Sequence, residues 1–125
     1  MSYILIAEDD RDLLLLVQRK LELSGYEDVW MTHNGEDALK KALESPPRLM
    51  ILDIMLPGVD GLTVCSEIKD KLGDKAPPII IISARGQKTH VQEGTDAGAD
   101  AYIIKPFSPR DLVAKMDELL GEGFS

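Results

Sequence analysis

The sequence predicts an α/β fold in which a parallel sheet of five strands carries helices on both faces. Five short apolar runs alternate with segments whose apolar residues recur at helical spacing. Two of the runs, at residues 49–52 and 79–82, are apolar at every position, which is typical of strands buried on both faces of a parallel sheet. Strands that alternate with helices pair in parallel through right-handed crossovers. Residues 1–125 are therefore expected to form one domain with three layers.

The first βα unit is expected to comprise a strand at residues 3–7 and a helix over residues 12–24. One helical face is predicted to point inward. Its apolar residues are Leu13, Leu16, Val17 and Leu21. Gly25 follows, at the position where glycine commonly ends a helix.

The second and third units follow the same pattern. A strand at residues 27–32 leads through Asn34 and Gly35 into a helix that the prolines at 46 and 47 stop. The apolar stripe of this helix is Ala38, Leu39, Ala42 and Leu43. The third strand is expected at residues 49–53 and its helix at 61–72, capped by Asp60. The inner face of that helix is predicted to use Cys65, Ile68 and Leu72.

The last two units contain the strongest strand and the weakest helix. Four consecutive isoleucines, at positions 79–82, are typical of a buried strand. The helix expected over residues 88–97 has few apolar residues and contains Gly94, which disfavours a helix by about 1 kcal/mol relative to alanine. A fifth strand at 101–104 precedes a helix that starts with Ser108 as its cap and Pro109 at its first position. Its apolar face is Leu112, Val113, Met116 and Leu120.

Composition narrows the functional classes. Hydrophobic residues make up 44% of the 125 residues and charged residues 29%, which is typical of a soluble globular domain. The net charge of −8 argues against direct binding to nucleic acid or to an anionic membrane. No segment approaches the ~20 apolar residues of a membrane span, and no signal peptide is expected. Cys65 is the single cysteine, so no internal disulfide is expected, and together these features favour the cytoplasm.

Chemically active side chains follow four of the five predicted strands. The carboxyl ends of parallel strands meet at one edge of the sheet, where ligands bind in open α/β folds. We therefore expect the side chains there to converge. They are Glu8 and Asp9 after the first strand, Asp53 at the end of the third, Ser83 and the Ala84 amide after the fourth, and Lys105 after the fifth.

Three carboxylates with one lysine are suited to a cation and a phosphoryl group. Carboxylates gathered at one point either take up a proton or bind a cation, and Mg²⁺ prefers such oxygen ligands. The cation and Lys105 would neutralise phosphoryl oxygens, and Asp53 is the best-placed nucleophile for an aspartyl phosphate.

Each residue alone also has an ordinary structural explanation. Asp53, Glu8 and Asp9 fit as caps of turns or helices, and Ser83 as the end of a strand. Lys105 fits as a solvated lysine and Tyr102 as a core residue. Cys65 is expected in the core. His33 and His90 are expected on the surface, away from these strand ends.

With these motifs in order, the sequence closely resembles the receiver domain of two-component response regulators over essentially its whole length. The matching segments are residues 4–10, 52–58 with Asp60-Gly61, 82–84, and 98–107. The resemblance implies a flavodoxin-like sheet with strand order 2-1-3-4-5.

The resemblance also implies a role for each site residue. Asp53 would accept a phosphoryl group from the phosphohistidine of a sensor kinase or histidine phosphotransfer protein. Mg²⁺ would be held by Asp9, Asp53, the Met55 carbonyl and, through water, Glu8. Ser83, Lys105 and the Ala84 amide would contact the phosphoryl oxygens. Tyr102 would turn inward when Ser83 moves toward the phosphate, and the Lys105–Pro106 peptide bond would be cis.

Phosphorylation would then alter the face formed by the fourth helix, the fifth strand and the fifth helix. The weak fourth helix fits an element that moves. The altered face would bind a downstream effector, an output domain, or a second copy of the chain in a homodimer. Val91, Ala101 and Gly121 occupy positions on this face where many dimer-forming relatives carry charges.

Two other functional classes compete with the switch. A haloacid-dehalogenase-like phosphohydrolase also uses an aspartate nucleophile, but it needs a second aspartate two residues later, where this chain has Met55. A phosphate-independent interaction module would have lost the chemistry, whereas Glu8, Asp9, Asp53, Ser83 and Lys105 are all present. The expected protein is therefore a signalling switch and not an enzyme acting on other substrates.

Overall fold

A computed structural model describes residues 3–84 and 88–121, without the side chains of residues 88–91. Its five strands form one sheet in the order β2-β1-β3-β4-β5, and all neighbours are parallel. The strands are β1 (Ile4–Ala7), β2 (Val29–Thr32), β3 (Leu49–Asp53), β4 (Ile79–Ser83) and β5 (Ala101–Ile104). The predicted α/β class and the flavodoxin-like strand order are confirmed.

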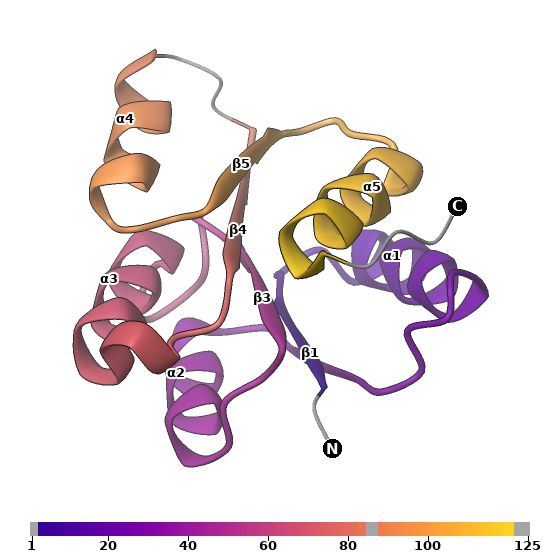
Figure 1. Ribbon diagram of the computed structural model, residues 1–125. Helices are drawn as coiled ribbons and strands as arrows, with labels where there is room; N and C mark the ends of the chain where they lie inside the picture. Colours follow the sequence, from indigo (N-terminus) through magenta and orange to yellow (C-terminus); the bar gives the residue numbers. More distant parts are fainter. Residues whose placement is uncertain (1–2, 85–87, 122–125) are drawn as a thin grey trace.

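Helices cover both faces of the sheet, as Figure 1 shows. One face carries α1 (Arg11–Leu23) and α5 (Pro109–Leu120). The other face carries α2 (Gly35–Glu44), α3 (Gly61–Leu72) and α4 (Lys88–Asp96). A short 3₁₀ helix, Gly73–Lys75, follows α3 and was not expected from the sequence. No helix in the described part of the chain has both the length and the apolar character needed to cross a membrane.

Two hydrophobic cores lie on opposite faces of the central strands. Alternate residues of β3 point to opposite faces, so Met50 and Leu52 join the core under α2 and α3. Leu49 and Ile51 join the core under α1 and α5. Every residue of β3 and β4 is buried. Cys65 lies in the first core, as predicted.

The inner face of α1 differs from the prediction. Leu14, Val17 and Leu21 are buried, whereas Leu16 is 60% exposed. Residues 13–16 are four consecutive leucines, so two neighbouring stripes fit the helical spacing equally well. The sheet selects the stripe through Leu14, and the assignment of Leu16 to the core is wrong.

Other boundaries shift by a few residues. The second strand begins at Val29 and not at residue 27, where exposed Glu27 and Asp28 precede it. Helix α3 buries Val64 in addition to the predicted Cys65 and Ile68. The predicted surface position of His90 and the apolar contribution of Val91 fall on side chains outside the described residues.

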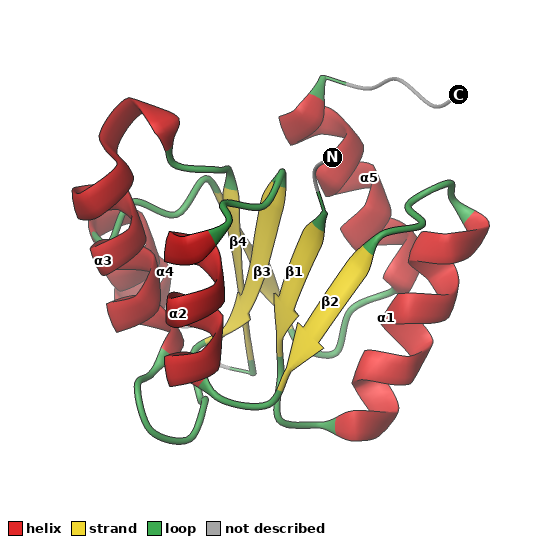
Figure 2. Ribbon diagram, turned by 90° about the horizontal axis from the view of Figure 1, so that it is seen from below, coloured by secondary structure: helices red, strands yellow, loops and turns green. Residues whose placement is uncertain are grey.

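Side-chain caps start the helices that leave the carboxyl edge of the sheet. Asp10 accepts hydrogen bonds from the Asp12 and Leu13 amides at the start of α1. The caps of α2, α3 and α5 are Asn34, Asp60 and Ser108. These caps satisfy backbone amides in the first turns of α1, α2, α3 and α5 and set where the loops that precede these four helices end. Figure 2 shows the strands pointing toward this edge.

Candidate functional site

Asp53 ends the central strand β3 and is only 4% exposed. Its Oδ1 accepts a hydrogen bond from the Met55 amide at 3.1 Å. Its Oδ2 accepts one from the Lys105 ammonium at 2.9 Å. Both carboxylate oxygens are therefore oriented. The Met55 amide of the following loop orients Oδ1, and the ammonium of Lys105, which directly follows β5, orients Oδ2.

Lys105 joins two carboxylates. Its Nζ lies 2.6 Å from Glu8 Oε1 as well as 2.9 Å from Asp53 Oδ2. Burial lowers the pKa of Lys105, but hydrogen bonds and charge interactions with Glu8 and Asp53 outweigh burial and raise it. The lysine therefore remains a cation in the site.

Glu8 is the most buried carboxylate of the group, at 2% exposed. Its Oε2 accepts a hydrogen bond from the Asp10 amide at 3.0 Å. Its Oε1 is buried and pairs with the Lys105 ammonium at 2.6 Å. Burial first, and the adjacent Asp53 in addition, raise the pKa of Glu8. Two ionised carboxylates against one ammonium leave an excess negative charge, which a divalent cation would offset.

Asp9 takes a different position from the other two carboxylates. It is exposed, and it lines an open hollow of about 440 Å³ together with Met55 and Asp60. Among the side chains that the structure describes, those of residues 3–84 and 92–121, no three carboxylate, histidine or cysteine groups already form a metal cage. The structure thus joins Glu8, Asp53 and Lys105 directly and places Asp9 at the rim beside Met55.

Ser83 and Ala84 follow the neighbouring strand. Ser83 ends β4 fully buried, and its carbonyl accepts a hydrogen bond from the Lys105 amide at 2.7 Å. Ala84 is exposed. Tyr102, on β5, is half-buried, and its ring lies close enough to Gly94 that an added Cβ there would be 2.9 Å from the ring. Serine and tyrosine lie on adjacent, paired strands, two residues apart in register.

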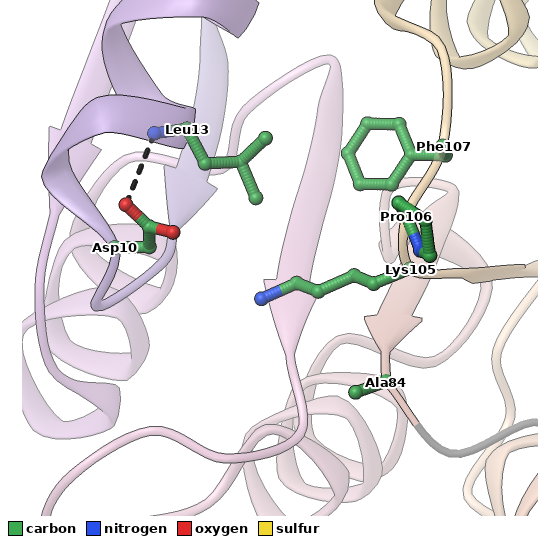
Figure 3. Close-up of a pocket in the computed structure, with 6 residues that line it drawn as sticks. All are labelled: Asp10, Leu13, Ala84, Lys105, Pro106 and Phe107. Atoms are coloured by element: carbon green, nitrogen blue, oxygen red, sulfur yellow. Dashed lines mark hydrogen bonds between the residues drawn. The ribbon is translucent and has the colours of Figure 1, made fainter.

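A second hollow, lined mostly by apolar groups, lies beside the Lys105 side chain (Figure 3). Its volume is about 310 Å³. Leu13 and Phe107 point toward one another across it, and the Lys105 side chain runs along it. Asp10, Ala84 and Pro106 complete the lining, and the Lys105–Pro106 peptide bond, for which the resemblance implied a cis form, is cis.

The position of His33 corrects a prediction. His33 is exposed, but it is not remote from the site: it directly follows β2, and its Nδ1 lies 3.4 Å from the Glu8 carbonyl oxygen. The sequence predicts functional groups at the ends of only the four strongly apolar strands, and the second strand is not one of them. All five parallel strands end at the same edge, and that rule alone would have placed His33 there.

Comparison with known proteins identifies the family. Residues 4–117 match the response regulator receiver domain. The chain belongs to this family. The transcriptional regulatory protein ResD of Bacillus subtilis is 40% identical over 117 residues, which are 94% of this chain and 47% of ResD. The chain thus spans about half the length of this relative.

Solved receiver domains have the same fold. The BeF3-activated DrrB receiver domain is 31% identical, with a TM-score of 0.85 over 97% of this chain and 99% of that one. A CheY-like receiver domain from Methanospirillum hungatei is 32% identical, with a TM-score of 0.87 over 98% of this chain and 95% of that one. Membership of this family makes the chain a two-component signalling domain.

Proposed function

We propose that this chain is a phosphorylation-activated switch in which Asp53 accepts a phosphoryl group from a phosphohistidine. The observation that carries the proposal is the buried Asp53 carboxylate, held by the Lys105 ammonium and the Met55 amide beside a second buried carboxylate. A carboxylate so oriented is a competent nucleophile, since its oxygens are positioned before the reaction.

The transfer exchanges one bond for another. An Asp53 carboxylate oxygen forms the new bond to phosphorus as the nitrogen–phosphorus bond of the phosphohistidine breaks. The imidazole leaves with that electron pair. The Lys105 ammonium, which pairs with the Asp53 carboxylate before the reaction, then pairs with a phosphoryl oxygen. Its positive charge thus stabilises the negative charge that the phosphoryl group brings to Asp53. Ser83 and the Ala84 amide donate to the remaining phosphoryl oxygens.

The site residues fit a Mg²⁺ ion. Glu8 Oε1 and Asp53 Oδ2 share the single Lys105 ammonium, so the site has more carboxylate than ammonium charge. Asp9, Asp53 and the Met55 carbonyl would hold the ion, with Glu8 acting through water. Bound there, Mg²⁺ would supply positive charge that offsets the negative charge of the phosphoryl oxygens during transfer.

The signal would pass through Ser83 and Tyr102 to the surface formed by α4, β5 and α5. Ser83 moves toward the phosphoryl group, and the Tyr102 ring follows into the space beside β4. The switch transfers a phosphoryl group only to itself, with slow self-catalysed hydrolysis, and it is not an enzyme acting on other substrates.

The partners follow from this role. A sensor histidine kinase or a histidine phosphotransfer protein donates the phosphoryl group in the cytoplasm. An effector protein, or an output domain in a longer chain such as that of ResD, reads the altered face. A homodimer through α4, β5 and α5 is a further form of this readout, and size-exclusion chromatography with beryllofluoride tests it directly.

Incubation with phosphoramidate and Mg²⁺, followed by intact-protein mass spectrometry, tests the function. The unmodified chain is expected to gain one phosphoryl group. Asp53→Asn abolishes that gain, whereas Asp70→Asn, which changes an exposed carboxylate on α3, retains it. Rapid release of many phosphates per chain would indicate a phosphohydrolase, and no gain at all would indicate a bare interaction module. Either result contradicts the proposal.

A further inference from the structure

The turn between β2 and α2, residues 32–35, contacts both loops of the candidate site. On one side it meets the loop that carries Glu8 and Asp9. The Glu8 amide donates to the Thr32 carbonyl at 3.1 Å, and His33 Nδ1 lies 3.4 Å from the Glu8 carbonyl oxygen. This turn lies outside the group of residues to which the proposed function gives a chemical role.

On its other side the turn meets the loop of residues 54–60, which follows Asp53. The Gly35 amide donates to the Pro57 carbonyl at 3.4 Å. A Cβ added to Gly35 would lie 1.7 Å from the Val59 carbonyl oxygen and 3.2 Å from Val59 Cβ. Gly35 does not have a positive φ angle, so the neighbouring backbone, and not its own conformation, excludes a side chain.

The loop, and not the helix, is the part that would give way. Helix α2 is anchored by Ala38 and Ala42, which are fully buried, and by the Asn34 cap. In the loop, Leu56 is buried, but Met55, Pro57 and Gly58 are exposed and Val59 is only half-buried. An added methyl group at position 35 would therefore push the loop backbone at Val59 outward, because Val59 and its exposed neighbours are held less firmly than the fully buried Ala38 and Ala42.

Movement of the loop would change the orientation of the Asp53 carboxylate, because the two are joined by one hydrogen bond. The Met55 amide donates to Asp53 Oδ1 at 3.1 Å, so the loop orients that carboxylate. The same loop carries the Met55 carbonyl. The turn at 32–35 thus spans the two loops and sets the separation between Glu8 in one loop and Met55 in the other, whose amide orients Asp53.

We propose that Gly35 is a positioning residue for phosphorylation, because the β2–α2 turn acts as a spacer that fixes the two acidic loops relative to each other. The proposal rests on the function proposed for Asp53. It predicts a defect in cation binding and acceptor geometry rather than in the folding of α2, since alanine forms helices better than glycine.

The test compares the unmodified chain with Gly35→Ala and with Lys40→Ala, an exposed alanine substitution on the same helix. Three quantities are measured: the amide resonances of residues 54–60 without Mg²⁺, the Mg²⁺ concentration that gives half-maximal phosphorylation by phosphoramidate, and the urea midpoint of unfolding. Gly35→Ala is expected to shift the loop resonances and to raise the Mg²⁺ requirement about 10-fold or more, as loss of support around metal ligands does. Lys40→Ala is expected to change neither the loop resonances nor the Mg²⁺ requirement.

Unchanged loop resonances and an unchanged Mg²⁺ requirement in folded Gly35→Ala would overturn the spacer while leaving the proposed function intact. If Gly35→Ala does not fold, Mg²⁺ titration of the unmodified chain decides: the amides of residues 32–35 must respond together with those of 54–58, and silence at 32–35 overturns the proposal. If the unmodified chain takes up no phosphoryl group, the proposed function fails and the spacer falls with it.

Discussion

The phosphoryl-acceptor side of the sheet and the α4–β5 side differ in how firmly they are held. On the acceptor side, β3 and β4 are buried along their whole length and each pairs with two neighbours. On the other side, β5 is an edge strand whose residues are half-buried, and Ile104 is 46% exposed. A change of charge at Asp53 therefore meets a rigid centre, and the less buried edge is where the structure can adjust.

The glycines of the two sides repeat this contrast. Gly61 faces backbone: an added Cβ would lie 2.2 Å from the Asp53 carbonyl oxygen. Gly94, in α4, faces a side chain: the added Cβ would lie 2.9 Å from the Tyr102 ring. Backbone in a central strand cannot move without breaking strand pairing, whereas a tyrosine ring changes rotamer. The backbone around Asp53 is thus held rigidly, whereas the Tyr102 side chain can change its conformation.

The largest expected effect comes from paired isoleucines on the two sides. Ile82 of β4 and Ile103 of β5 are partners in register, but Ile82 is 2% exposed and Ile103 is half-buried. Ile82→Ala is expected to cost about 2–5 kcal/mol of unfolding free energy, as buried truncations do. Ile103→Ala is expected to cost about 1–2 kcal/mol, because less apolar surface is lost. Urea denaturation measures both.

Equal losses from the two isoleucine variants would contradict the contrast, since they would mean that the edge strand is packed as firmly as the centre. The m-value serves as the control. It should stay constant in both variants, so that a change of midpoint reports a change of stability and not of the unfolded state.

A smaller effect is expected from the two glycines. Gly61→Ala should lower the unfolding free energy by about 1–3 kcal/mol through overpacking and should also slow phosphorylation of Asp53. Gly94→Ala should change stability by less than about 1 kcal/mol, because the displaced ring is offset by the better helix propensity of alanine. Urea denaturation gives the stabilities, and mass spectrometry gives the phosphorylation rates.

The position of the Tyr102 ring separates the two glycine variants further. Gly94→Ala should alter the NMR signals of the isotope-labelled Tyr102 ring before phosphorylation, while Gly61→Ala should leave them unchanged. Gln92→Ala, at an exposed position of the same helix, is the matched control for α4. A Tyr102 signal that is the same in Gly94→Ala as in the unmodified chain would show that the glycine does not set the ring position.

The contrast also explains which features were predictable from the sequence. The buried strands were found because Ile79 to Ile82 and Leu49 to Leu52 are apolar at every position. The rule that parallel strands end at one edge then brought Glu8, Asp53 and Lys105 together, and the structure has these three in direct contact. Strands that are buried on both faces can therefore be recognised in the sequence as runs without polar residues.

Features that depend on close approach left no such signal. Choosing Leu14 over Leu16 for the core required the position of the sheet, because both fit the helical spacing. His33 was separated from the site because β2 is an edge strand with a weakly apolar sequence. Gly35 read as an ordinary turn residue, since its contact with Val59 joins residues far apart in the chain.

The smallest expected change in unfolding free energy concerns α5. This helix packs on the central strands and also forms part of the surface with α4 and β5. One end is tied to the rigid part of the molecule, where the buried Tyr26 hydroxyl donates to Asp117 Oδ1 on α5. Burial first, and the bond and charge of Asp117 in addition, raise the pKa of Tyr26 well above its ordinary value. Tyr26→Phe is expected to cost about 1 kcal/mol at neutral pH, the usual contribution of one hydrogen bond.

The pH dependence of that loss follows from the raised pKa. The unfolded chain releases the Tyr26 proton near pH ~10, whereas the folded chain retains it, so the stabilisation by Tyr26 is complete below pH ~10 and is lost as pH rises toward the folded pKa. Urea midpoints of the unmodified chain and Tyr26→Phe should therefore differ at pH ~8 and converge at pH ~11. A constant difference between these two pH values would show that the hydroxyl acts through packing alone. In that case the hydrogen bond to Asp117 would not hold α5, and the attachment of α5 would rest on its buried apolar residues, Leu112 and Met116 among them.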